Sequence, residues 1–396
     1  MNVKKTLTGL KDRASLNRTL DRIEGESDEE FVYREYKVSQ RSKALFLCGF
    51  VALFIILIGL KITQGPYDIS FVEVYQTIWH HITGDIVEPM FDNVVWEQRM
   101  PRVLTAVIVG VGLAAAGAAM QSMMKNPLAD PYTTGISSGA LFGATLAMTA
   151  GIYIVGGFYG RVVNAFVFAM VPALFIIALS RWKKPSPAMM ILVGIAIMYI
   201  FNAFQSYMML RADPNSASAV YTWSVGSIGM TTWDQIPIIF AVSAVGFIAL
   251  FLMTRTLNAL NSGDSYAKSL GINVDRVRIL CLVIISLIAA GIVSFTGIIG
   301  FVGLVSPHIA RIFVGSDNRI LLPASALLGA CMMIICDMAA FIIVGSTLQI
   351  GIVTAMIGGP IFMLILIAQQ KEVWRCRRSA SRTWPPGTAT SASGRA

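Results

Sequence analysis

The sequence predicts an all-α polytopic membrane protein with ten transmembrane helices. Of its 396 residues, 55% are hydrophobic and only 13% are charged, and the mean hydropathy is +0.67. This composition excludes an ordinary soluble globule. The apolar runs are long and continuous, which favours helices over the short alternating strands of a barrel. The net charge of +9 comes largely from Lys and Arg in short loops beside apolar runs. That pattern is typical of cytosolic loops and does not indicate a nucleic-acid-binding face.

The chain begins with a polar arm and then a first span. Residues 1–42 alternate in charge sign and carry Leu and Ile at loose helical spacing, which predicts a cytosolic arm that is part helix. The first span is expected at 44–60. Residues 63–98 carry acidic side chains and no Lys or Arg, which places them outside. Within them, residues 72–82 are expected to form an amphipathic helix on the outer membrane face, anchored by Trp79.

The middle of the chain supplies five more spans, joined by loops whose charges set their sides. The RWKKPSP loop (181–187) is basic and is expected inside, and the KNPLADP turn (125–131) is expected to be cytosolic too. The third span follows the KNPLADP turn directly. Residues 211–234 form an outer loop with Trp223 and Trp233 at the interface. The second, fourth, fifth and sixth spans are expected at residues 103–120, 162–179, 189–209 and 236–253.

Three glycines predict a packing seam in the third span. Gly135, Gly139 and Gly143 stand four residues apart in GISSGALFG. On a helix this spacing puts them on one face, where another helix can approach closely. The sequence does not identify that neighbouring helix.

The last third of the chain contains an apolar run too long for one crossing. Residues 279–310 include no Asp, Glu, Lys or Arg over 32 positions, whereas one span needs about 20 apolar residues. The glycines of GIIGFVG (297–303) offer a turn, and the charges that follow favour a short eighth crossing that ends inside at 311–319. Two further spans at 320–344 and 350–368 complete ten, with both termini cytosolic.

The expected organisation is therefore an arm, one membrane domain and a tail. The ten-helix domain covers residues 43–371, and a cytosolic tail covers 372–396. The final stretch, 379–396, is low in complexity and unlike the rest of the chain. It indicates an appended or reading-frame remnant and is excluded from the fold assignment.

A folded polar loop, 258–275, separates the sixth and seventh spans and is expected in the cytosol. Asp264 is a suitable N-cap for a helix over 265–270, and Gly271 suits a left-handed stop. Asn273 is then expected to cap the next helix. A short helix with its own start and stop indicates either a surface that a partner protein grips or a well-capped connector.

The sequence contains no constellation for covalent chemistry. There is no G-x-x-x-x-G-K-[ST], so the chain cannot use ATP through a P-loop, and no enzyme activity is expected. No metal or nucleophile cluster is present, and the three histidines indicate packing rather than ligands. Five cysteines are odd in number and lie mostly in apolar runs, which does not favour a disulfide framework. Twenty methionines are scattered through every span and indicate adaptable packing.

Asp337 is the one acid well inside a span. An intramembrane acid suggests a functional site, here an ion-gradient-driven secondary transporter. The alternative is a carboxylic acid, neutral or hydrogen-bonded, that ties helices together. No basic partner is evident in the sequence, and the second interpretation is favoured.

Two arginines stand at the outer mouth of the second span. Arg99 and Arg102 in QRMPR are spaced so that both can emerge on one side of the helix start. They could pair with carboxylates of an arriving protein or with an anionic substrate. The alternative is that they anchor in headgroups or satisfy local backbone.

Several ordered motifs together resemble one family, the FecCD or type II permease subunits of ABC importers for iron–siderophore complexes, heme and cobalamin. The resemblance extends from about Trp96 to Pro360, and its motifs are listed here in order. They are RMPRVLTAVIVGVGLAAAGAAMQSMMKNPLADPYTTGISSGALFGA, AKSLGINVDRVR, GIIGFVGLVSPHIARIFVGSDNRILLPASALLGACMMIICD and GIVTAMIGGP.

The resemblance implies the BtuC-like fold of ten spans and a defined set of partners. These are a second permease copy or paralogue, two ATPase subunits that carry ATP and Mg, and an extracytoplasmic substrate-binding protein. The implied location is a prokaryotic cell membrane. No cofactor is implied in this chain itself.

The resemblance also assigns roles by position. It implies docking of the binding protein at Arg99 and Arg102, and a cytosolic gate at Asn126, Pro127 and Leu128. The implied coupling residues, which would seat in the ATPase, are Asn261, Ser262, Gly263, Asp264, Ser265, Tyr266, Ala267, Lys268, Ser269, Leu270 and Gly271. Similar proteins often carry an Arg where this chain has Phe341, so one outer docking contact is missing. The substrate, among ferric siderophore, heme and corrinoid, is left open.

Overall fold

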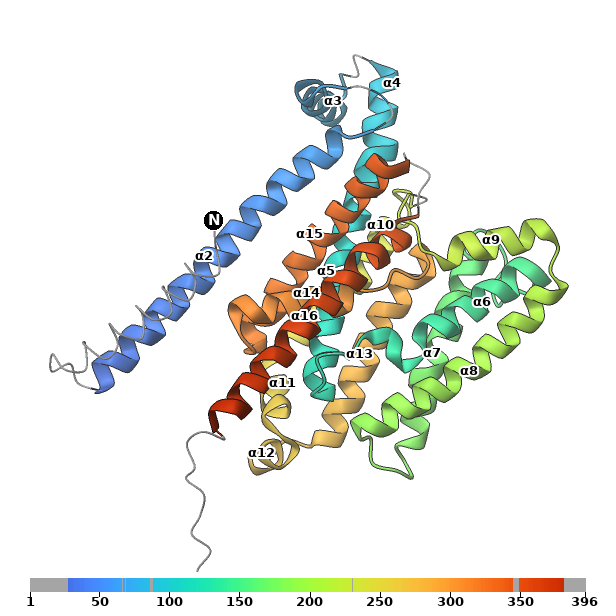
Figure 1. The fold of residues 1–396 in the computed structure, drawn as a ribbon. Coiled ribbons are helices and arrows are strands. Elements are labelled where there is room, and N and C mark those ends of the chain that lie inside the picture. Colours follow the sequence, from blue (N-terminus) through green and yellow to red (C-terminus); the bar gives the residue numbers. More distant parts are fainter. Residues whose placement is uncertain are drawn as a thin grey trace, which may run out of the picture. The chain divides into compact units, whose positions relative to one another are not determined.

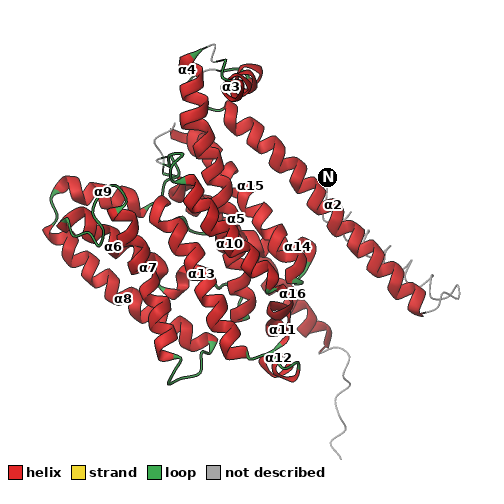
Figure 2. Cartoon of the chain, turned by 180° about the vertical axis from the view of Figure 1, so that it is seen from behind, coloured by secondary structure: helices red, strands yellow, loops and turns green. Residues whose placement is uncertain are grey.

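The regular secondary structure of the described residues is entirely helical. The computed structural model describes residues 28–380, apart from 66, 68, 86–87, 230 and 345–348. No strand occurs within these residues (Figure 2), as the predicted all-α class requires. The chain divides into two compact units, with the boundary between Ala52 and Leu53. Of the expected arm, residues 28–42 are helical, and residues 1–27 lie outside the described part.

The helices follow one another in the order shown in Figure 1. Before the centre of the chain these are α2 (Asp28–Thr63), α3 (Phe71–Thr83), α4 (Pro89–Asp92), the π-helix η1 (Asn93–Arg99), α5 (Met100–Met124), the 3₁₀ turn η2 (Pro131–Thr134), α6 (Ile136–Ala150), α7 (Gly160–Leu179) and α8 (Pro187–Arg211). After it come α9 (Pro214–Ser224), α10 (Ile236–Leu252), α11 (Thr254–Ser262), α12 (Asp264–Ser269), α13 (Val274–Thr296), α14 (Val302–Val314), α15 (Asn318–Val344) and α16 (Ile350–Ala380).

The apolar helices coincide one for one with the ten expected spans. Six of the described helices are long and apolar enough to cross a membrane, and they are Lys43–Thr63, Pro89–Met124, Gly160–Leu179, Pro187–Arg211, Val274–Thr296 and Asn318–Ile343. A seventh results if α10 and α11, which are bent by 57° at their junction, form one broken span. The other three segments are shorter apolar helices, Ile136–Ala150, Val302–Val314 and Ile350–Ile365. Length and composition alone thus support six or seven of the ten.

Helix α5 is the centre of the second unit. It is buried along most of its length, because alanines and glycines on it admit neighbouring helices closely. Its most extensive partner is α15. A Cβ atom on Gly110 would lie 2.5 Å from the carbonyl oxygen of Gly329, so the two backbones touch. One on Gly117 would overlap the carbonyl group of Gly303 in α14.

Two of the three glycines predicted to form a packing seam in the third span pack against the fourth span, and Gly135 does not. Gly139 and Gly143 of α6 face the carbonyl groups of Phe168 and Asn164 in α7, where a Cβ atom would overlap them. Gly135 does not belong to this face. It precedes α6 with a φ of +89° and lies against Gly194 of α8. The regular spacing suggested one face, but the helix begins only at Ile136.

The turn expected in the long apolar run is present at 297–301. Helix α13 ends at Thr296, Gly297 and Phe301 adopt positive φ values of 70° and 68°, and α14 begins at Val302. Gly358 in α16 gives Phe301 room, since a Cβ atom there would lie 2.6 Å from the phenylalanine Cβ. Pro307 lies inside α14 and does not end it.

The segment 63–98 contains the amphipathic helix that the sequence predicted. Helix α3 opens with a capping box between Ser70 and Glu73. Trp79 is 66% exposed on it, so the helix presents apolar surface. Its position on a membrane stays a prediction. Trp223, expected at the interface, is instead buried in the cluster of α6, α7 and α13.

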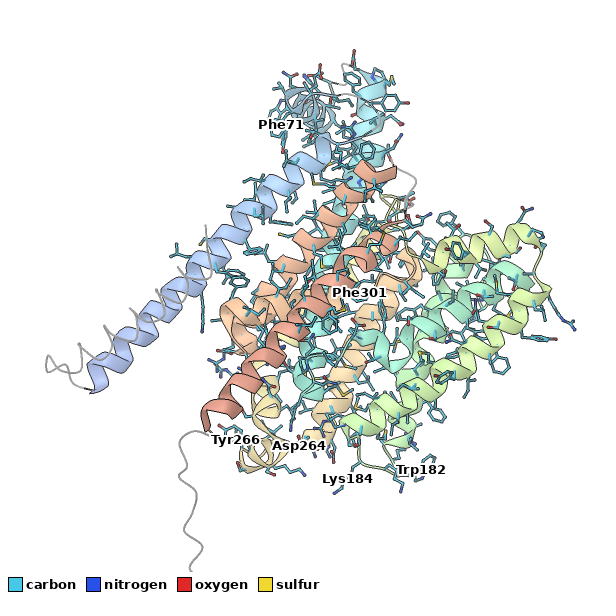
Figure 3. All side chains as sticks on the ribbon, viewed as in Figure 1. Phe71, Trp182, Lys184, Asp264, Tyr266 and Phe301 are labelled. Carbon is cyan, nitrogen blue, oxygen red and sulfur yellow. The ribbon has the colours of Figure 1, made fainter. Side chains whose placement is uncertain are left out.

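The second unit has two ends that match the predicted sides. Figure 3 shows Asp264 and Tyr266 of α12 at the same end as Trp182 and Lys184, and Phe71 of α3 at the opposite end. The two loops expected inside therefore share one end. The helix expected outside lies at the other.

Candidate functional site

A small helix, α12, forms the tip of the polar loop between α11 and α13. It packs on a local apolar cluster through Ala267, which is fully buried. Tyr266 and Leu270 are 53% and 57% exposed. Gly271 ends the turn with a φ of +77°, and Asn273 caps α13 by accepting the Arg276 N–H at 3.1 Å. The left-handed stop and the Asn273 cap are confirmed.

The predicted N-cap at Asp264 was wrong. Gly263, with a φ of +134°, holds that position, and Asp264 is the first helical residue. Its carboxylate makes no cap because two cations bind it. Arg278 of α13 donates from Nη2 to both oxygens at 2.8 and 2.9 Å, and Lys125 donates from Nζ to Oδ1. The Lys125 hydrogen bond, with that of Arg278, holds the pKa of Asp264 below its usual value.

Lys125 links α12 to the turn that was predicted as a cytosolic gate. It ends α5 in the left-handed conformation, with φ 52° and ψ 33°. For a residue with a Cβ this conformation costs about 1–2 kcal/mol. Asn126 then folds the turn by accepting the Leu128 N–H at 3.0 Å, and Pro127 and Leu128 are exposed. The gate and coupling residues of the sequence analysis therefore lie side by side.

A second polar connection lies in the same region and was missed by sequence analysis. Asn258 of α11 accepts from the backbone N–H and the side chain of Asn318, both at 2.8 Å. The Asn318 side chain in turn accepts from Ser122 Oγ of α5 at 2.8 Å. Asn318 and Ser122 are almost fully buried. Ser122 and Asn318 lie near helix ends, but no spacing rule pairs them with Asn258 in the middle of α11.

A cavity of about 370 Å³ opens between these elements. Its walls include Asn126 and Pro127 of the gate turn, Asn261 of α11 and Arg311 of α14. Among its described lining residues no acid occurs. The cavity therefore carries the cations Lys125 and Arg311 close to the exposed tip of α12.

At the opposite end, which is predicted to face outside, Arg99 has a structural role. It is only 6% exposed. Its guanidinium donates to the carbonyl oxygens of Ile62, Thr63 and Tyr67 at 3.0, 2.8 and 2.7 Å. These hydrogen bonds hold the end of α2 and the residues after it against η1. The structure therefore supports the alternative that Arg99 satisfies local backbone groups.

Arg102 belongs to a buried charge cluster. It donates from Nε to both oxygens of Asp337 at 3.0 Å and from Nη2 to Oδ1 at 2.7 Å. Lys61 of α2 lies 2.9 Å from the other oxygen of the same carboxylate and 5.7 Å from the ring centroid of Phe341. The expectation that Asp337 has no basic partner was wrong. Asp337 ties three helices together as an ion triad.

The triad borders a cavity of about 550 Å³ at the end predicted to face outside, called the outer cavity below. Lys61, Arg99 and Arg102 line it, together with Glu97 and neutral polar residues. Neither arginine is presented as an isolated exposed cation, but the Arg102 side chain is 19% exposed.

Comparisons with known proteins agree with this architecture. The profile of the FecCD transport family matches residues 53–368. The hemin transport system permease protein HmuU of Yersinia pestis is 32% identical, with 84% of this chain and 98% of HmuU covered. The Fe(3+)-citrate import system permease protein YfmE of Bacillus subtilis is 33% identical, with 83% and 98% covered. An inward-facing structure of a metal-chelate type ABC transporter matches with a TM-score of 0.73 at 28% identity, and covers 82% of this chain and 99% of that one.

Proposed function

This chain belongs to the FecCD transport family and is a permease subunit of an ABC importer, and from that premise we propose that α12 is the contact through which a separate ATPase drives it. The supporting observation is the exposure of Tyr266 and Leu270 on a helix that is itself fixed by Asp264. Burying such a side chain against a partner contributes about 1.5–3 kcal/mol. The exposed pair therefore suits a soluble partner at the end that also carries Lys184 (Figure 3).

The transport cycle follows from this contact. ATP binding on the partner subunits closes them, α12 is displaced, and the gate turn at 126–128 opens or shuts. The ATPase can shift the permease between its two states only by as much as its affinities for those states differ. The coupling residues 261–271 are the surface on which that difference acts. ATP and Mg belong to the partner, and this chain contributes no cofactor.

We infer a larger assembly around this subunit. It comprises a second permease copy or paralogue, two ATPase subunits and an extracytoplasmic binding protein, in a prokaryotic cell membrane with both termini in the cytosol. For docking of the binding protein, the partly exposed Arg102 beside the outer cavity is the better candidate. Arg99 is already occupied by backbone carbonyls.

The proposed cargo is a metal chelate. The names of the relatives support this class, since HmuU is a hemin permease and YfmE an Fe(3+)-citrate permease. Ferric siderophore, heme and corrinoid are the candidates within it. The alternative of an ion-gradient-driven transporter that uses Asp337 gains no support, because Lys61 and Arg102 hold that carboxylate.

The test replaces the exposed pair. Tyr266→Ser with Leu270→Ser leaves the buried Ala267 in place and is expected to reduce co-purification of the ATPase at least tenfold, with loss of ATP-driven uptake. Trp182→Ser is the matched control, since Trp182 is 79% exposed at the same end but outside α12. Unchanged ATPase binding in the double variant would refute the proposal. Uptake of hemin, ferric citrate and cobalamin into proteoliposomes with ATP inside, in the presence and absence of an ionophore, tests cargo and energy source.

A further inference from the structure

Two separate contacts join the cytosolic end of α5 to residues 258–271, the segment that contains α12. One is the charged contact of Lys125 with Asp264, at the tip of α12. The other is the chain of hydrogen bonds from Asn258 of α11 through Asn318 to Ser122. The two contacts engage α5 within one helical turn of its end.

The two fastenings differ in character. The Lys125 and Asp264 side chains are 31% and 39% exposed, so their ion pair contributes little to folding stability. The Asn258 connection is mostly buried and has its polar groups paired, so breaking it would strand polar atoms. The first contact can therefore be removed without unfolding the protein, whereas the second holds the parts in register.

Asp264 also joins this end of α5 to α13. Its carboxylate accepts at both oxygens from Arg278, whose side chain is 4% exposed, and at Oδ1 also from Lys125. A displacement of α12 would therefore act on Arg278, which is buried in α13, and on Lys125, the residue directly before the gate turn. No other described residue bridges α12 to that turn by an ion pair.

We propose that α11, α12 and the end of α5 move as one mechanical unit, and that Lys125 is the positioning residue that transmits a push on α12 to the gate turn at 126–128. This inference rests on the proposed function of α12. Lys125 touches neither cargo nor ATPase in this scheme. It acts by holding the gate turn to Asp264, and its left-handed backbone places that turn directly after α5.

The experiment compares Lys125→Met with the conservative Lys125→Arg in the assembled transporter. Lys184→Met is the matched control, because it removes one positive charge from the same end of the molecule. Each variant is reconstituted with its ATPase and binding protein. Three quantities are measured: ATPase co-purification, the rate of ATP hydrolysis and the amount of cargo taken up per ATP hydrolysed.

Lys125→Met is expected to bind the ATPase and hydrolyse ATP normally, while uptake per ATP falls at least about fivefold, the lower end of typical coupling effects. Lys125→Arg should restore most of the uptake. Ser122→Ala, which breaks the second fastening, should lower uptake per ATP as well as stability. Because thermal stability of Lys125→Met should match the parent, misfolding is not confused with uncoupling.

Three results would overturn the inference. These are unchanged uptake per ATP in Lys125→Met, an equal fall in Lys184→Met, or loss of the ATPase from Lys125→Met, which would make Lys125 a docking residue. Failure of the proposed function looks different, because the parent protein itself would then not bind an ATPase through α12.

Discussion

Replacing Asp337 with Asn removes the charge that holds Lys61 and Arg102 together. Asp337 is completely buried, and the Lys61 side chain is only 5% exposed. Removing one partner from a buried ion pair costs about 3–5 kcal/mol, because the remaining charge is left unpaired. Lys61 and Arg102 both line the outer cavity, but the Arg102 side chain is 19% exposed and the Lys61 side chain only 5%, so water replaces the lost carboxylate better at Arg102. The stranded Lys61 therefore dominates, and we expect Asp337→Asn to lower the free energy of unfolding by about 3 kcal/mol, the lower end of that range.

A second substitution tests this reasoning. Lys61→Met in the Asp337→Asn background removes the stranded cation and keeps a long apolar side chain. Removing both charges of a buried ion pair avoids the cost of leaving one of them unpaired. The double variant should therefore unfold within about 1 kcal/mol of the parent.

The assay is denaturant unfolding of the purified protein in detergent, followed by tryptophan fluorescence. A single variant as stable as the parent would refute the argument, as would a double variant no more stable than the single. Folded Asp337→Asn protein should still show ATP-driven uptake that an ionophore does not abolish. Strict loss of uptake with intact ATP hydrolysis and intact folding would instead revive a role for Asp337 in transport.

Two further outcomes follow from packing and burial. Gly139→Val should lower the free energy of unfolding by about 1–3 kcal/mol in the same assay, because the new side chain would meet the Phe168 carbonyl. Gly156 has open space around it, so Gly156→Ala should leave the free energy of unfolding unchanged. Burial raises the pKa of Asp130 to about 6 from an ordinary value of 3.8. Folding is thus penalised above pH 6, where the buried carboxyl group is ionised, and not below about pH 4, where it is protonated in both states. Asp130→Asn, which can still accept the Tyr132 N–H, should add up to about 3 kcal/mol of stability at pH 7 and none below pH 4, with thermal unfolding across pH as the measurement.

The sequence predicted the elements that depend on neighbouring residues. Hydropathy located the apolar segments, and local chemistry located the Gly271 stop and the Asn273 cap. These features rest on backbone geometry within a few positions, so a single sequence contains their signal. Gly135 was misassigned because a four-residue spacing does not show where a helix begins.

The contacts that organise the candidate site were beyond local reasoning. Asp264 and Lys125 are 139 positions apart in the chain, and Asp337 and Arg102 are 235 apart. No periodicity links such pairs, and each residue alone fits several interpretations. Asp264 looked like an N-cap because the carboxylate was considered without its distant cations. Asp337 looked unpaired for the same reason.

Helices α5 and α15 run antiparallel and are joined at three levels. Arg102 meets Asp337 near one end, Gly110 meets Gly329 midway, and Ser122 meets Asn318 near the other. Interlocked backbones at the middle level prevent one helix from sliding past the other. We therefore expect the two helices to move together as one rigid pair. If α12 moves the Ser122 end of this pair, we expect the Arg102 end to move with it.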